Sequence, residues 1–244
     1  MQFPPLKYRI FALIFTITIV ILNTFTGWSL PNDNQPIQCV IDSSFTITEE
    51  INAFLNKPEN TNIINPILIA ISFLSDSLLL ITGYKWIQNG TNYRFILTII
   101  SIYVIKTLFH FLLRLELPHG YLWSYPGFPS ITISYMNTNS FFFNGPLCLL
   151  TVLAKELYYS KEELMMLLTV FDMLLLGSLL ILLRANYIID IIFAIIFGDI
   201  VYEVFKRVVY KEKIFILHNT NSDVIDDIEE KEYLIMDNKP LTNI

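Results

Sequence analysis

Six apolar runs of 17 to 21 residues constrain this chain more than any other feature of its sequence. An apolar helix of about 20 residues is long enough to cross the ~30 Å hydrocarbon layer of a membrane. Polar clusters bound each run, as is typical of membrane-spanning helices. The six predicted helices are Ile10 to Trp28, Pro66 to Trp86, Phe95 to Leu115, Phe141 to Leu157, Leu164 to Leu183 and Tyr187 to Phe205. The sequence therefore predicts an all-α, polytopic membrane protein built as a six-transmembrane-helix bundle.

The composition of the 244 residues favours this class and excludes several others. Hydrophobic residues make up 54% and charged residues only 16%, which excludes an ordinary soluble domain and a disordered chain. The net charge of −6 argues against nucleic acid as a partner. Two cysteines, Cys39 and Cys148, are too few for a disulfide framework. The sequence indicates no cofactor and no metal site.

The basic residues predict the orientation, because Lys and Arg near the ends of spans are held back from translocation. Ten basic residues fall on the side of the termini: Lys7, Arg9, Lys85, Arg94, Lys155, Lys161, Lys206, Arg207, Lys211 and Lys213. Only three fall on the other side: Lys57, Arg114 and Arg184. We therefore expect an integral, multi-pass protein with both termini in the cytoplasm or the mitochondrial matrix. The membrane itself, an endomembrane or the mitochondrial inner membrane, stays open.

Two long loops are expected on the side opposite the termini. The first contains Thr46 to Leu55, which predicts a short amphipathic helix lying at the membrane interface. The second, Glu116 to Ser140, is rich in aromatic residues, as expected at headgroup level. The domain boundary follows the last span: residues 1–207 form the six-helix domain, and residues 208–244 form an acidic cytoplasmic or matrix tail with eight Asp/Glu against four Lys.

Ionisable side chains inside the apolar runs are candidates for function, because an unpaired charge there costs roughly 2.5–3.5 kcal/mol. They are Asp76, Lys106, His110, Asp172, Asp190 and Asp199. Lys106, His110 and Arg114 follow at intervals of four and so share one helix face. With Arg184 they form a candidate site for a phosphate headgroup. The alternative is structural: Lys106 pairs with a buried aspartate, His110 is neutral, and Arg114 reaches the interface. For Asp172 and Asp199 we expect hydrogen bonding between helices.

Asp190 lies one turn after Asn186 near the start of the sixth run. A carboxylate one turn below a side chain on the same face is an arrangement that orients a histidine for nucleophilic or acid-base chemistry. Residue 186, however, is an asparagine.

Four segments together resemble one family of lipid enzymes. They are Leu115-Glu116-Leu117-Pro118, Pro126-Gly127-Phe128-Pro129, Ser140 to Pro146, and Arg184 to Asp190. Their order and spacing are similar to the sphingomyelin synthase and phosphatidylcholine:diacylglycerol cholinephosphotransferase branch of the type 2 phosphatidic acid phosphatase superfamily. The resemblance covers about residues 60–207 and implies six helices with a site opposite the termini.

In that family one histidine attacks the headgroup phosphorus, an aspartate orients it, and a second histidine assists the leaving group. The resemblance carries the aspartate to Asp190 and the glycine of the fourth helix to Gly145. Both histidines are replaced, because Asn144-Gly145-Pro146 and Asn186 stand in their segments. Neither an amide nor proline can replace imidazole. We expect Asn144 and Asn186 to face each other across one cleft, and Pro146, placed one turn into the helix, to reshape it.

These features lead to three hypotheses. The first is a catalytically inactive descendant of a lipid phosphotransferase that binds phospholipids or acts as a scaffolding subunit among the protein subunits of a membrane complex. The second is an active headgroup phosphotransferase or phosphatase that uses His119 with Asp190. The third is transport of a lipid or anion along the basic stripe that contains Lys106.

Overall fold

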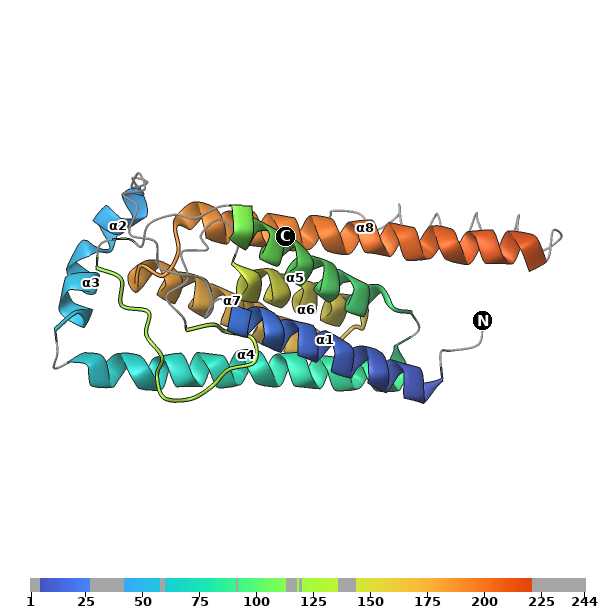
Figure 1. The fold of residues 1–244 in the computed structure, drawn as a ribbon, viewed down its shortest axis with the longest axis horizontal. Coiled ribbons are helices and arrows are strands. Elements are labelled where there is room, and N and C mark those ends of the chain that lie inside the picture. The colour runs from blue at the N-terminus through green and yellow to red at the C-terminus, as the bar shows by residue number, and fades with distance from the viewer. Residues whose placement is uncertain are drawn as a thin grey trace. The chain divides into compact units, whose positions relative to one another are not determined.

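A computed structural model describes residues 5–26, 42–57, 60–90, 92–112, 118, 120–135 and 144–220. These residues form eight helices and no strand, so the all-α prediction is confirmed for the part described (Figure 1). The helices are α1 (Leu6–Thr26), α2 (Ser43–Ile47), α3 (Glu49–Leu55), α4 (Thr61–Asn89), α5 (Arg94–Leu112), α6 (Gly145–Tyr159), α7 (Glu163–Leu182) and α8 (Ile188–Thr220). The chain divides into two compact units, Met1–Glu203 and Val204–Ile244.

Six of the helices correspond to the six predicted runs, but some of their bounds differ. The interfacial segment is two short helices instead of one, because the chain breaks at Thr48 between α2 and α3. α8 continues to Thr220 and so extends beyond the predicted end at Phe205. α6 begins at Gly145, and residues 141–143 lie outside the described part of the chain.

α6 is the core helix of the first unit. Nine of its residues are buried, and it packs against α4, α5 and α7. α8 also approaches it closely at Gly198, where an added Cβ would lie 2.9 Å from the Cys148 carbonyl oxygen. The largely apolar stretch of α6 from Leu147 to Leu153 is thus enclosed by neighbouring helices.

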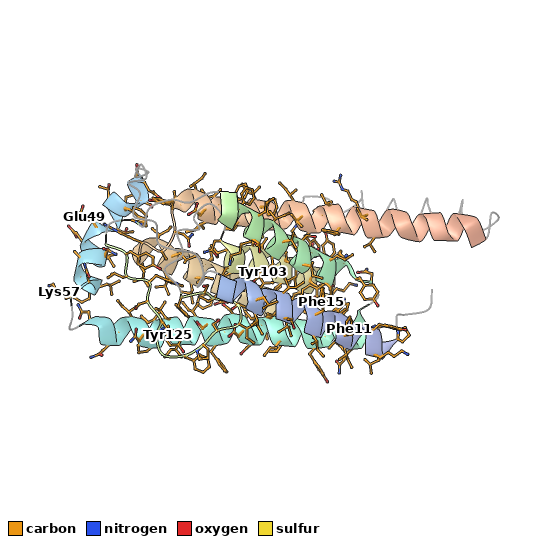
Figure 2. All side chains as sticks on the ribbon, viewed as in Figure 1. Phe11, Phe15, Glu49, Lys57, Tyr103 and Tyr125 are labelled. Carbon is orange, nitrogen blue, oxygen red and sulfur yellow. The ribbon has the colours of Figure 1, made fainter. Side chains whose placement is uncertain are left out.

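Two helices among the described residues are long and apolar enough to cross a membrane: Asn62–Asn89 and Glu163–Leu182. Large apolar side chains are also exposed on the outer surface, among them Phe11 at 69% and Leu164 at 71%. Phe11 and Phe15 stack with ring centroids 6.5 Å apart on α1 (Figure 2). Contiguous apolar surface of this kind is unusual on a soluble monomer. Among the described residues, two of the six predicted membrane-spanning helices meet the criterion of length and apolar composition.

An irregular segment, residues 120–135, lies alongside α4 (Figure 1). Asp76 holds it, since the carboxylate accepts four hydrogen bonds, from Ser130 Oγ at 3.0 Å, Ile131 N at 3.0 Å, and the N and Oγ1 of Thr132 at 2.9 and 2.7 Å. Asp76 is about 22 Å from the start of α4 at 1.5 Å per residue. Buried backbone without regular secondary structure needs hydrogen-bond partners from elsewhere in the protein, and Asp76 supplies them here.

The same segment is held at a second point by Tyr135. Its hydroxyl donates to the Leu68 carbonyl at 2.9 Å and is hydrogen bonded to Ser72. Burial raises the pKa of Tyr135 to about 12, so the hydroxyl keeps its proton at neutral pH. Trp123 stacks on Tyr135 with centroids 5.3 Å apart. Side chains of the segment thus fill the space beside α4.

Two buried or half-buried aspartates join pairs of helices. Asp172 accepts from Ser75 Oγ at 2.7 Å and links α7 to α4. Asp199 forms an ion pair with Lys155 at 2.5 Å and links α8 to α6. The expectation that both aspartates bond between helices is confirmed.

Replacing Asp76 by asparagine should release segment 120–135. The amide oxygen can still accept, but its NH₂ faces a backbone N–H, and a hydrogen bond to a charged group contributes about 1.5–3 kcal/mol. We expect amide hydrogen exchange at Ile131 and Thr132 to be about tenfold faster or more. Asp199→Asn is the control and should leave exchange in this segment unchanged. Equal protection in the wild type and Asp76→Asn would contradict the role given to Asp76.

Candidate functional site

The start of α6 forms one half of the candidate site. Asn144 is its N-cap, with extended backbone and a side-chain Oδ1 that accepts from Leu147 N at 2.9 Å. Gly145 and Pro146 are the first two helical residues. Backbone N–H groups in a first turn have no partner within the helix, so proline is tolerated there without loss of a hydrogen bond. The expectation that Pro146 lies one turn into the helix is therefore wrong.

The start of α8 forms the other half. The Asp190 carboxylate accepts from Tyr187 N at 3.0 Å and from Asn186 Nδ2 at 3.3 Å. A second carboxylate, that of Asp42 before α2, accepts from Ile188 N at 2.7 Å and also caps α2 through Ser44 N at 2.9 Å. Carboxylates favour helix N-termini because they accept from free N–H groups and offset the positive end of the helix dipole. Asp190 therefore has a structural role at the start of α8.

A direct hydrogen bond joins the two helix starts. Asn144 Nδ2 donates to Asn186 Oδ1 at 2.8 Å, although the residues are 42 positions apart. The exposed fractions of Asn144, Asn186 and Asp190 are 7%, 8% and 1%. The structure thus brings together the two asparagines expected to face each other, in a chain of bonds that runs from Asn144 through Asn186 to Asp190.

Lys106 of α5 lies against the start of α6. A Cβ added to Gly145 would be 2.8 Å from Lys106 Cδ and 3.2 Å from Nζ, so a larger residue there would displace the lysine side chain. The Nζ is 5.7 Å from the centre of the Tyr103 ring. Of the carboxylates in the described ranges, none forms an ion pair with Lys106. The alternative in which Lys106 pairs with a buried aspartate is not observed there.

The two helix starts differ in charge as a consequence. At the start of α8, the N–H of Ile188 donates to Asp42 and the N–H of the preceding residue, Tyr187, donates to Asp190. The first turn of α6 has a neutral amide as its cap and an ammonium group beside it. A helix N-terminus carries about half a positive charge. The positive end of α6 is therefore reinforced by Lys106, whereas that of α8 is neutralised.

Other residues named by the sequence lie elsewhere or outside the described part. Arg184 has a positive φ of 54° and contacts α2, where Nη2 donates to the Phe45 carbonyl at 3.3 Å and the guanidinium lies 5.5 Å from the Phe45 ring centre. The structure does not place it with Lys106. Arg114 and His119 lie outside the described residues, as does the side chain of His110.

Sequence reasoning missed two residues that support the site, Asp42 and Asn52. Asn52 Nδ2 donates to the Gly120 carbonyl at 3.1 Å and to the Leu182 carbonyl at 2.9 Å, which ties α3 to the end of α7. Gly120 has φ +78°, and a Cβ there would meet Asn52 Oδ1 at 2.7 Å. A buried asparagine within an otherwise exposed short helix offers no periodicity that would reveal its partners.

The chemistry open to this cluster is limited. Amide nitrogens are neither basic nor nucleophilic at neutral pH, and the Asp190 carboxylate is already bonded to Tyr187 N and Asn186. Within the described ranges, no group of three or more His, Cys, Asp or Glu side chains is arranged to hold a metal ion. What the start of α6 can do is attract an anion, through its N-terminus and Lys106.

No family model matches the chain, and neither a curated protein nor a solved structure is significantly similar to it. The resemblance to the cholinephosphotransferase branch rests on the residues alone.

The bond between Asn144 and Asn186 should appear as coupling in a double-mutant cycle. Asn144→Ala removes a helix cap worth about 1 kcal/mol, and Asn186→Ala removes the partner of the cap. We expect a coupling energy of about 0.5–1.5 kcal/mol in thermal unfolding of the detergent-solubilised protein. Asn144→Ala combined with Asn52→Ala, which shares no bond with it, should be additive. Additivity in both cycles would contradict the contact.

Proposed function

We propose that the protein is a multi-pass membrane protein in which α1, α4, α5, α6, α7 and the start of α8 all cross the bilayer. Support comes from the two long apolar helices and the exposed apolar side chains around them. Both termini are proposed to lie in the cytoplasm or matrix, in an endomembrane or the mitochondrial inner membrane. Arg9, near the start of α1, donates to the Ile87 carbonyl near the end of α4 at 3.0 Å. This contact supports the proposal that these two helix ends lie on the same side of the membrane.

Within that membrane, the proposed function is a lipid-binding or scaffolding subunit of a larger complex: a catalytically inactive protein that resembles lipid phosphotransferases and holds a phospholipid headgroup at the start of α6. One observation carries this proposal. The N-terminus of α6 has a neutral cap and an adjacent ammonium group, whereas the N-terminus of α8 already faces two carboxylates. A headgroup phosphate supplies the negative charge that the start of α6 lacks.

We expect no turnover because of the chemistry of the three hydrogen-bonded side chains Asn144, Asn186 and Asp190. In the family that the sequence resembles, imidazole is the nucleophile and the acid. Here the corresponding positions hold Asn144 and Asn186, whose amides bond to each other and to Asp190. Loss of a nucleophile or its base removes orders of magnitude of rate and leaves positioning and electrostatics. Binding without chemistry is the expected result.

Replacing Lys106 by glutamine tests the binding half of the proposal. A charge-assisted hydrogen bond contributes about 1.5–3 kcal/mol, so we expect affinity for phosphatidylcholine, measured by native mass spectrometry of the purified protein, to fall about 10- to 100-fold. Lys57→Gln removes a charge from an exposed residue and is the matched control. If both variants retain lipid equally, the site is not at the start of α6.

A turnover assay tests the inactive half. Purified protein in lipid micelles should release no diacylglycerol or headgroup phosphate from choline or ethanolamine phospholipids. Turnover that disappears in Asp190→Ala would favour the alternative, an active headgroup phosphotransferase or phosphatase, and loss in His119→Ala would assign the base. The transport alternative predicts lipid or anion flux in liposomes that depends on Lys106.

A further inference from the structure

A polar cavity of about 300 Å³ lies at the other end of α6. It is formed where α4 and α6 end, where α5 begins, and by the turn before α7, and its lining includes Thr82, Lys85, Trp86, Arg94, Glu156 and Glu162. A water molecule occupies about 30 Å³ of liquid, so the space corresponds to about ten waters. A small molecule or a lipid headgroup fits a space of this volume.

Arg94 is held firmly in the wall of this cavity. Its Nη2 donates to Glu156 Oε2 at 2.8 Å, and Tyr202 OH donates to the same oxygen at 2.7 Å. The guanidinium also lies over two rings, 4.8 Å from the centre of Tyr202 and 5.4 Å from that of Tyr159. An arginine fixed in this way presents its remaining donors without further loss of side-chain entropy.

Two buried donors of the lining have no hydrogen-bond partner: Thr82 Oγ1 and Arg94 Nε. Thr82 is only 2% exposed. Other buried threonines in the helices, such as Thr98 and Thr169, donate to the carbonyl one turn earlier, at 2.8 Å in both cases. Leaving a buried donor unpaired costs about 1–3 kcal/mol. Thr82 Oγ1 is therefore a buried, unpaired donor in the wall of this cavity, and an acceptor that reaches it would remove that cost.

The charges of the lining sum to zero. Arg94 and Glu156 form the inner pair, with side chains 14% and 13% exposed. Lys85 and Glu162 form the outer pair at 2.5 Å, with side chains 32% and 40% exposed. A ligand that carries a single charge would lie close to lining groups of the same sign and be repelled by them. A ligand with one anionic and one cationic group, in contrast, matches both signs.

We propose that this cavity binds a zwitterion that joins a phosphodiester to an ammonium group. The phosphodiester oxygens accept hydrogen bonds from Thr82 Oγ1 and Arg94 Nε, and the ammonium group pairs with the Glu162 carboxylate. Two sources share this chemistry, a free glycerophosphodiester and the headgroup of a membrane phospholipid. The proposal is independent of the site at the start of α6, since it involves neither Asn144 nor Lys106.

The test uses the full-length protein in nanodiscs and two probes. Soluble glycerophosphoethanolamine is titrated by calorimetry, and nanodiscs of phosphatidylethanolamine are compared with nanodiscs of phosphatidylglycerol, which has no ammonium group, by thermal stabilisation. We expect binding of the first probe and greater stabilisation by phosphatidylethanolamine. Stabilisation by the lipid with no binding of the soluble probe assigns the lipid as the source, and binding of the soluble probe supports the free diester. Failure of both tests, with no binding of the soluble probe and equal stabilisation by the two lipids, overturns the proposal.

Matched variants locate the ligand. Thr82→Val should weaken binding about tenfold, because it removes a hydrogen bond to a charged group, whereas Thr169→Val, which is equally buried, should not. Without ligand, Thr82→Val should melt no lower than the wild type, since it removes an unpaired donor. Equal affinity in both threonine variants overturns the site.

Glu162→Gln tests the recognition of the ammonium group. It should weaken binding of glycerophosphoethanolamine while leaving binding of inorganic phosphate unchanged or tighter, and an unchanged ratio overturns the zwitterion assignment. Lys106→Gln should leave both affinities unaltered. The Lys106→Gln variant therefore distinguishes binding in this cavity from binding at the start of α6.

Discussion

The need to give buried polar groups hydrogen-bond partners is the constraint on which most of this structure depends. Asp76 shows it most fully, because its carboxylate accepts four hydrogen bonds from residues 130–132 and so allows irregular backbone to lie alongside α4. Asn52 likewise donates to two carbonyls, those of Gly120 and of Leu182 at the end of α7. Since unpaired groups are costly in a medium of low polarity, these side chains determine where the connecting segments lie.

The same constraint shapes the candidate site. Each helix that begins there exposes N–H groups that need an acceptor, and the chain supplies a neutral amide for α6 and carboxylates for α8. Asn144 caps α6 and donates to Asn186, and Asn186 in turn donates to Asp190, so three hydrogen bonds connect the two helix starts. An arrangement that resembles a catalytic relay thus has a complete structural explanation, and its remaining asymmetry is electrostatic, in the position of Lys106 beside Gly145.

Much of the fold followed from the sequence, because apolar runs bounded by polar clusters are a local signal. The helical state of all six runs is of this kind, and so are the starts of α5, α7 and α8, each within one residue of its predicted position. The break at Thr48 and the continuation of α8 to Thr220 were missed, since helix ends depend on caps and neighbours as much as on hydropathy. Pro146 was misplaced because the predicted helix began four residues before Gly145. Arg184 was grouped with Lys106 by charge, although its partner is Phe45.

By itself, the sequence determined the helical class, the approximate helices and the residue types of the site, because each depends on a residue and its near neighbours in the chain. The tertiary structure alone decided which groups meet: Asn144 with Asn186, Asp42 with the start of α8, and Asp76 with a segment more than fifty residues away. It also decided that Thr82 and Arg94 line one cavity with unpaired donors. Such contacts join distant positions, and their energies depend on burial and partners that no local pattern encodes.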